Sequence, residues 1–146
     1  RLTTFGTVYF PGPEYPFTRI YEPKNRSAEM SPPDQTSIVA EIPCQENEAT
    51  WQMDDDEIIR LVRSHLQPLG WFQDHQVIEG RVLRLKHAYP VLEKGIELKV
   101  ERVSAYLSSF ENLAQCGRNA TFLHASMHDV IRQGKDAVES LPASVC

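Results

Sequence analysis

Runs of β-forming residues alternate with turn signals along the chain. Pro11-Gly12-Pro13 interrupts the first run and β-forming residues resume after it, which predicts a hairpin with a wide loop. A polar, proline-bearing segment over 23–33 predicts an exposed loop before the next run. Between 77 and 89 apolar and charged positions alternate with a period of two, which predicts a long strand. The predicted strands cover 3–10, 17–21, 37–42 and 77–89, with a short buried-type strand over 113–116.

Apolar residues at helical spacing predict helices over the longer segments. The first helix opens with Asp54-Asp55-Asp56-Glu57, acids that complement the helix dipole and cap free amides at a helix N-terminus. Neighbouring positions on a helix point in different directions, so this acidic run favours a helix start over a metal site. The last helix carries Met127, Val130, Ile131 and Val138 on one side. The predicted helices cover 54–68, 96–109 and 126–141.

Together these elements predict an α+β fold, in which an antiparallel sheet is covered by the helices near 54–68 and 96–109. A chain of 146 residues, 41% hydrophobic and 24% charged, has the balance of an ordinary soluble domain and can bury a core without disulfides. The cysteines Cys44, Cys116 and Cys146 are odd in number and widely spaced, which favours reduced thiols.

The charge balance and the lack of targeting signals narrow the range of partners and cellular locations expected for the chain. The formal net charge is −5 at pH 7, which argues against nucleic-acid binding because a polyanion requires a concentrated basic surface. No stretch approaches the roughly 18 apolar residues of a membrane span, and no secretory signal follows Arg1. The sequence therefore predicts a cytoplasmic protein that binds neither nucleic acid nor a membrane.

The sequence does not have residues at the spacing that the motifs of common cofactor and hydrolytic sites require. Neither G-x-G-x-x-G nor a P-loop can be drawn, and no G-x-S-x-G elbow supports a serine nucleophile. His124 and His128 stand at i and i+4 as a possible two-ligand face, but no third ligand is evident, so no metal site is predicted. Asp74-His75 and His128-Asp129 are more typical of solvated surface than of acid–base pairs. We therefore assign no catalytic residue, and a metal-dependent hydrolase built on His124 and His128 ranks last among the hypotheses.

A more specific arrangement joins the last predicted strand to the last helix. Gly117-Arg118-Asn119 follows the strand directly. The chain then crosses a turn that contains Phe122 and His124 and enters the helix at Ser126-Met127-His128. A helix N-terminus offers unpaired amides and a partial positive charge, which suit a phosphate or an electron-rich ring edge, and Arg118 can meet a pyrophosphate. Physical reasoning alone leaves an ordinary strand-to-helix turn as the other interpretation.

A series of short motifs accompanies this arrangement. In order they are Ala88-Tyr89-Pro90-Val91, Gly95 with a helix after it, Phe110-Glu111-Asn112-Leu113, Gly117-Arg118-Asn119, and Ser126-Met127-His128-Asp129-Val130-Ile131. This order of motifs resembles the C-terminal end of flavin amine-oxidase-type proteins, above all UDP-galactopyranose mutases and protoporphyrinogen-oxidase-like relatives. Val8-Tyr9-Phe10-Pro11 and the segment 36–44 resemble the sheet of that family's substrate domain. The resemblance spans most of the chain, and its strongest motif lies within 112–134.

The resemblance implies FAD as the cofactor and an unidentified small molecule as the substrate. Gly117 and Arg118 match the motif whose arginine meets the FAD pyrophosphate. Met127 matches a residue whose backbone amide approaches the flavin ring. Ser126 falls where relatives often carry an acid that binds the ribityl chain.

Substrate contacts are implied at Phe122 and His124. However, His124 and Ala125 stand where the mutases place tyrosines for the phosphates of a sugar nucleotide. We therefore do not predict the mutase reaction for this chain from the resemblance.

The resemblance also implies a division of the chain by origin. Residues 1–111 are expected to form substrate-domain-like sheet and helices, and 112–146 a strand-turn-helix segment of the FAD domain. Because the family's glycine fingerprint is missing, the chain is expected to be either the C-terminal part of a longer FAD-dependent oxidoreductase, inactive alone, or a shortened relative. The shortened relative would be a non-catalytic binding or dimerisation module. The apolar side of the last helix predicts a homodimer, formed by exchange of that helix.

Overall fold

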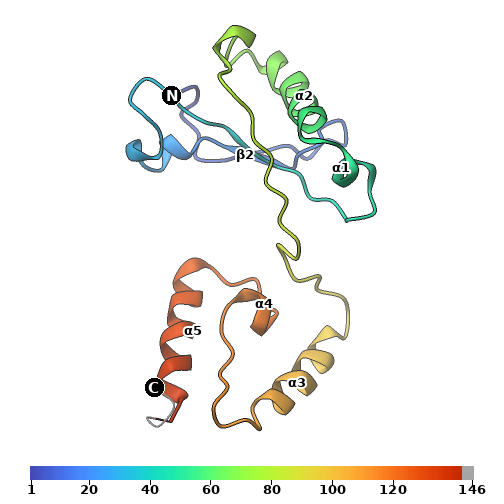
Figure 1. Ribbon diagram of the computed structural model, residues 1–146, viewed down its shortest axis with the longest axis vertical. Helices are drawn as coiled ribbons and strands as arrows, with labels where there is room; N and C mark the ends of the chain where they lie inside the picture. Colours follow the sequence, from blue (N-terminus) through green and yellow to red (C-terminus); the bar gives the residue numbers. More distant parts are fainter. Residues whose placement is uncertain (143–146) are drawn as a thin grey trace. The chain divides into compact units, whose positions relative to one another are not determined.

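The computed structural model describes residues 1–142 (Figure 1). Contacts divide the chain into two compact units, Arg1–Leu83 and Arg84–Cys146. Neither Cys44 nor Cys116 forms a disulfide within the described range, and Cys146 lies outside it. In residues 1–142 no helix is both long and apolar enough to cross a membrane.

The first unit contains an antiparallel sheet in the order β1-β2-β3. Its strands are β1 (Val8–Tyr9), β2 (Arg19–Tyr21) and β3 (Val39–Glu41). The register pairs Ile20 with Val8 on one side and with Ala40 on the other, so Ile20 sits at the centre of the sheet. The predicted hairpin and third strand are confirmed. Each strand is shorter than predicted, because only Val8–Tyr9, Arg19–Tyr21 and Val39–Glu41 pair with a neighbouring strand.

The core of this unit forms where the sheet meets the end of helix α2 (Asp55–Leu66). Phe17 and Ile20 are each only 1% exposed and pack with Leu66. Phe10 meets Phe17 edge to face, with ring centroids 5.0 Å apart. Burying each of these large side chains stabilises the unit by roughly 1.5–3 kcal/mol.

The acidic run at Asp54 is a helix start, as predicted. The Glu57 amide donates to Asp54 Oδ1 at 2.8 Å, and the Asp54 amide donates back to Glu57 Oε2 at 2.9 Å, which completes a capping box. The remaining elements of this unit are short. They are the helix α1 (Ala49–Gln52) and the 3-10 turns η1 (Pro23–Asn25), η2 (Ala28–Met30), η3 (Gln67–Leu69) and η4 (Asp74–Gln76).

The strand predicted over 77–89 is absent, and that prediction is wrong. Ile78, Leu83 and Leu85 from this segment are 75%, 81% and 61% exposed. Alternation supplies the two faces of a strand, but a strand also requires a neighbouring backbone to hydrogen-bond, and in the described residues this segment has none. The short strand predicted over 113–116 is absent for the same reason.

The second unit is helical. It contains α3 (Ile96–Leu107), α4 (Arg118–Thr121) and α5 (Met127–Ser140), so the predicted helices over 96–109 and 126–141 are confirmed. Neither α3 nor α5 contains a buried residue. Among the described residues of this unit only Pro90 and Ala125 are buried. The chain is thus a mixture of helix and sheet, with its hydrophobic core confined to the first unit.

Candidate functional site

The residues that the sequence singled out lie around α4 and the start of α5. Gly117 precedes α4 with φ 90° and ψ 162°, a conformation that side chains disfavour. Its amide donates to Gln133 Oε1 on α5 at 2.9 Å, and its carbonyl accepts from the Thr121 hydroxyl at 2.9 Å. Gly117 therefore joins α4 to α5.

The loop after α4 folds back onto Arg118. Phe122 ends α4 in the left-handed region with φ 56°, and the Leu123 amide donates to the Arg118 carbonyl at 3.2 Å. Ala125 is 9% exposed, and its amide donates to the Leu123 carbonyl at 2.9 Å. As a result the Ala125 carbonyl accepts a hydrogen bond from Arg118 Nη2 at 3.0 Å.

A ring completes the surroundings of Arg118. The guanidinium carbon lies 5.0 Å from the centroid of the Tyr89 ring, within cation–π range. Tyr89 also meets the His124 ring, with centroids 5.9 Å apart. We call Tyr89, Arg118, His124 and the Ala125 carbonyl the Arg118 cluster. The sequence motif contained Tyr89 but gave no sign that it lies against Arg118.

Tyr89 reaches Arg118 because the segment before α3 is held to α4. Asn119 Nδ2 donates to the His87 carbonyl at 3.2 Å. His87 adopts φ 55°, a left-handed conformation uncommon for a residue with a side chain, and so turns the chain sharply. Pro90, directly after Tyr89, is buried.

Arg118 has no carboxylate partner within the described part of the chain. Its side chain is half-buried, and a guanidinium carries N–H donors on more than one edge. The Ala125 carbonyl takes a donor at one edge only. The remaining donors suit the paired oxygens of a phosphate or carboxylate.

The start of α5 is capped by its own residues. Ser126 and Asp129 form a capping box, in which the Ser126 amide donates to Asp129 Oδ2 at 3.1 Å and the hydroxyl bonds the same carboxylate. These hydrogen bonds lower the pKa of Asp129 below its usual value. The amides of Met127 and His128 have no hydrogen-bond partner among residues 1–142. Met127 is also 84% exposed, and within the described residues the helix start keeps two unpaired amides beside the capping box.

His124 and His128 do not form part of a metal-ligand group. Within the described range no cluster of three or more His, Cys, Asp or Glu side chains is placed to hold a metal ion. His128 Nδ1 instead lies 3.0 Å from the Ser126 hydroxyl, where it joins the helix cap.

The first unit contains a buried carboxylate that sequence reasoning missed. Glu22 is 2% exposed and accepts hydrogen bonds from the Leu2 and Thr3 amides and from Asn25 and Thr36. Burial alone would raise the pKa of Glu22, but the hydrogen bonds from Thr36, Leu2 and Thr3 outweigh it and lower the pKa to about 2. Glu22 thereby anchors the segment 1–5 to the end of β2.

Lys24 is a second buried charge, 7% exposed. Its Nζ donates to the carbonyl oxygens of Pro32, Pro33 and Gln35, at 3.0 Å for Pro33 and 2.6 Å for Gln35. The ammonium thus organises the loop before β3. In the sequence Glu22 and Lys24 look like ordinary surface charges, and only the fold reveals their burial.

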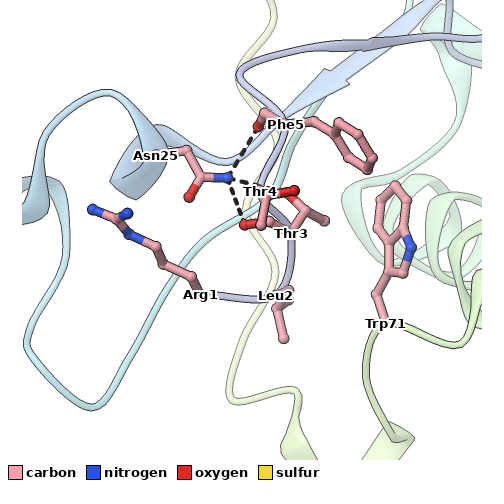
Figure 2. Close-up of a pocket in the computed structure, with 7 residues that line it drawn as sticks. All are labelled: Arg1, Leu2, Thr3, Thr4, Phe5, Asn25 and Trp71. Atoms are coloured by element: carbon pink, nitrogen blue, oxygen red, sulfur yellow. Dashed lines mark hydrogen bonds between the residues drawn. The ribbon is translucent and has the colours of Figure 1, made fainter.

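A cleft of about 470 Å³ lies against the segment that Glu22 anchors. Figure 2 shows the Asn25 amide bonded to this segment and the rings of Phe5 and Trp71 close together. The cleft contains none of the predicted site residues. It is lined by Arg1, Leu2, Thr3, Thr4, Phe5, Asn25 and Trp71.

Comparison with known proteins identifies no relative. No family model, curated protein or solved structure matches the chain. The resemblance to flavin amine-oxidase-type proteins therefore stays a prediction that rests on the residues quoted above.

Proposed function

We propose that this chain is the C-terminal portion of an FAD-dependent oxidoreductase of the amine-oxidase and UDP-galactopyranose-mutase type, inactive by itself. The observation that supports this best is the Arg118 guanidinium, half-buried and without a carboxylate partner in the described part of the chain. It bonds the residue directly before the N-cap of α5. A cation therefore lies close to a helix N-terminus that keeps two amides unpaired among residues 1–142, a combination that suits an anionic cofactor.

The donor groups fit FAD. Its pyrophosphate carries anionic oxygens of the kind that a guanidinium fork binds through paired hydrogen bonds. The amides of Met127 and His128 offer further donors at the positive end of the α5 dipole. The Asp129 carboxylate lies at the same end and stays ionised, because the hydrogen bonds from Ser126 lower its pKa, so the attraction for an anion would come mainly from Arg118. When bound, FAD would supply hydride or single-electron transfer.

Each residue would have a separate task. Arg118 would hold the pyrophosphate, with Gly117 fixing the backbone before it, and the Met127 amide would donate to the electron-rich edge of the flavin ring. Ser126 would approach the ribityl chain, although its hydroxyl already bonds Asp129. Phe122 and His124 would line the substrate side.

The unpacked surface of the second unit also supports a larger protein. Leu98 and Val103 on α3 are 72% and 57% exposed, and Ile131 on α5 is 74% exposed. Helices with an apolar side normally bury it against another element. We propose that 1–111 come from a substrate domain and 112–146 from the FAD domain, a division by origin that differs from the boundary after Leu83 set by contacts.

The test is the FAD affinity of the native protein that contains this chain, after the substitution Arg118→Ala. Loss of charge-assisted hydrogen bonds should weaken binding about 10- to 100-fold in a calorimetric titration. Arg132→Ala is the matched control, because Arg132 is an exposed arginine on α5 outside the cluster. Unchanged affinity in Arg118→Ala would refute the assigned role.

A second candidate function is a non-catalytic binding or dimerisation module derived from such a flavoprotein. The observation that favours it is the exposed apolar side of α5, where Met127, Ile131 and Val138 are 84%, 74% and 62% exposed. A second copy of the chain would cover this side. Sedimentation velocity at high protein concentration should then detect a dimer, and a monomer would count against this candidate.

A further inference from the structure

We propose that Tyr89 is a positioning residue for Arg118: its ring holds the guanidinium in the orientation that presents the remaining donors to a phosphate. The identification of the ligand as a phosphate depends on the proposed function. The contact between Tyr89 and Arg118 depends only on the geometry of the structure.

Two groups restrain the guanidinium in different ways. The face of the Tyr89 ring lies 5.0 Å from the guanidinium carbon and limits the tilt of its plane. The Ala125 carbonyl binds Nη2 at 3.0 Å and limits rotation within that plane. Nε and Nη1 have no hydrogen bond within residues 1–142, so they remain for the ligand. An arginine held in advance loses less conformational freedom when it binds.

Tyr89 contacts Arg118 and the His124 ring. Its side chain is 50% exposed, so it belongs to no core. Its place is set by neighbours on either side in the chain, through the hydrogen bond from Asn119 to the His87 carbonyl and the burial of Pro90. Removing the ring should therefore leave the backbone around it in position while releasing Arg118.

The orientation can be tested on this chain without any cofactor. Protons that lie over an aromatic face are shifted upfield, so the side-chain N–H signals of Arg118 should move downfield in Tyr89→Leu and stay in place in Tyr89→Phe. Arg118→Lys assigns the signals. Tyr106→Leu is the control, because Tyr106 is an aromatic residue of the same unit, 65% exposed, that contacts Phe110 instead. If the chemical shifts of the Arg118 side-chain N–H protons did not change in Tyr89→Leu, the proposal would be overturned.

The consequence for the ligand is tested with FAD and the native protein that contains this chain. We expect Tyr89→Leu to weaken FAD binding roughly three- to tenfold and Tyr89→Phe to restore it, because the ring supplies the interaction. If Arg118→Ala weakens binding but Tyr89→Leu does not, the positioning role is wrong and the proposed function stands. If neither substitution changes FAD affinity, the proposed function fails, and the role of Tyr89 toward a phosphate fails with it.

Discussion

The two units of this chain use similar sequence patterns with opposite results. In the first unit the apolar side of α2 reaches a core, where Leu66 is 5% exposed and packs with Phe17 and Ile20. In the second unit α3 and α5 have clear apolar sides and bury no residue. An amphipathic pattern therefore specifies the helix, whereas burial of its apolar side requires a partner that the second unit does not contain in its described residues.

Polar groups show the same contrast. Glu22 and Lys24 in the first unit are buried and fully hydrogen-bonded. In the second unit Arg118 keeps donors that no group in residues 1–142 accepts. The first unit thus contains a hydrophobic core and pairs its buried charges, whereas the described residues of the second unit have a largely exposed apolar surface and a cation with unpaired donors.

The largest expected effect is the loss of a core ring in the first unit. Phe17→Ala should lower the free energy of unfolding by about 3–5 kcal/mol, because it leaves a cavity at a side chain that is 1% exposed. Chemical denaturation measures this value. Phe5→Ala is the control, since Phe5 is 57% exposed and should change stability far less. Equal effects of the two would mean that the core is not where the structure has it.

Next is the acid sensitivity that Glu22 confers. Its pKa is lowered from 4.5 to about 2, so the ionised form is favoured in the folded state. The resulting stabilisation, of order 3 kcal/mol, is present above about pH 4.5 and is lost as the pH falls toward 2. Unfolding free energies measured across this range should fall steeply in the wild type.

The variant Glu22→Gln should be less stable at neutral pH and lack most of this pH dependence. Glu14→Gln is the matched control, because Glu14 is an exposed carboxylate of the same unit. If Glu22→Gln kept the acid sensitivity of the wild type, another group would have to be its source.

The smallest expected effect is that of Ile131→Ala, which is best compared with Ile58→Ala. Ile58 on α2 is 9% exposed and Ile131 on α5 is 74% exposed. In this chain Ile58→Ala should cost about 2–4 kcal/mol and Ile131→Ala less than about 0.5 kcal/mol. In the native protein that contains the chain, Ile131→Ala should cost more, because a partner would then cover α5. An equal, small cost in both settings would leave the α5 side without a partner.

The sequence predicted the elements that depend on local interactions. The helix start at Asp54 was predictable because its capping partner lies one turn away, and the entry to α5 at Ser126 follows the same logic. The strand over 77–89 was not, because alternation says nothing about whether a neighbouring strand exists. The hairpin could be predicted because its two strands are close in sequence.

In the candidate site, too, local features could be predicted from the sequence and contacts between distant segments could not. Arg118 and Met127 could be identified from a local motif at a helix entry. The contact between Tyr89 and Arg118 could not, because it depends on Asn119 binding the His87 carbonyl and on the left-handed turn at His87. The burial of Glu22 likewise depends on segments distant in the sequence.

We propose that this chain is the C-terminal part of a flavoprotein. The most direct test is the mass of the native protein isolated from its own cells, measured together with its visible absorption spectrum. We expect a product several hundred residues long, with a G-x-G-x-x-G turn near its start and the absorption bands of bound flavin. A flavin-free product little longer than this chain would contradict it and leave the binding or dimerisation module as the remaining function.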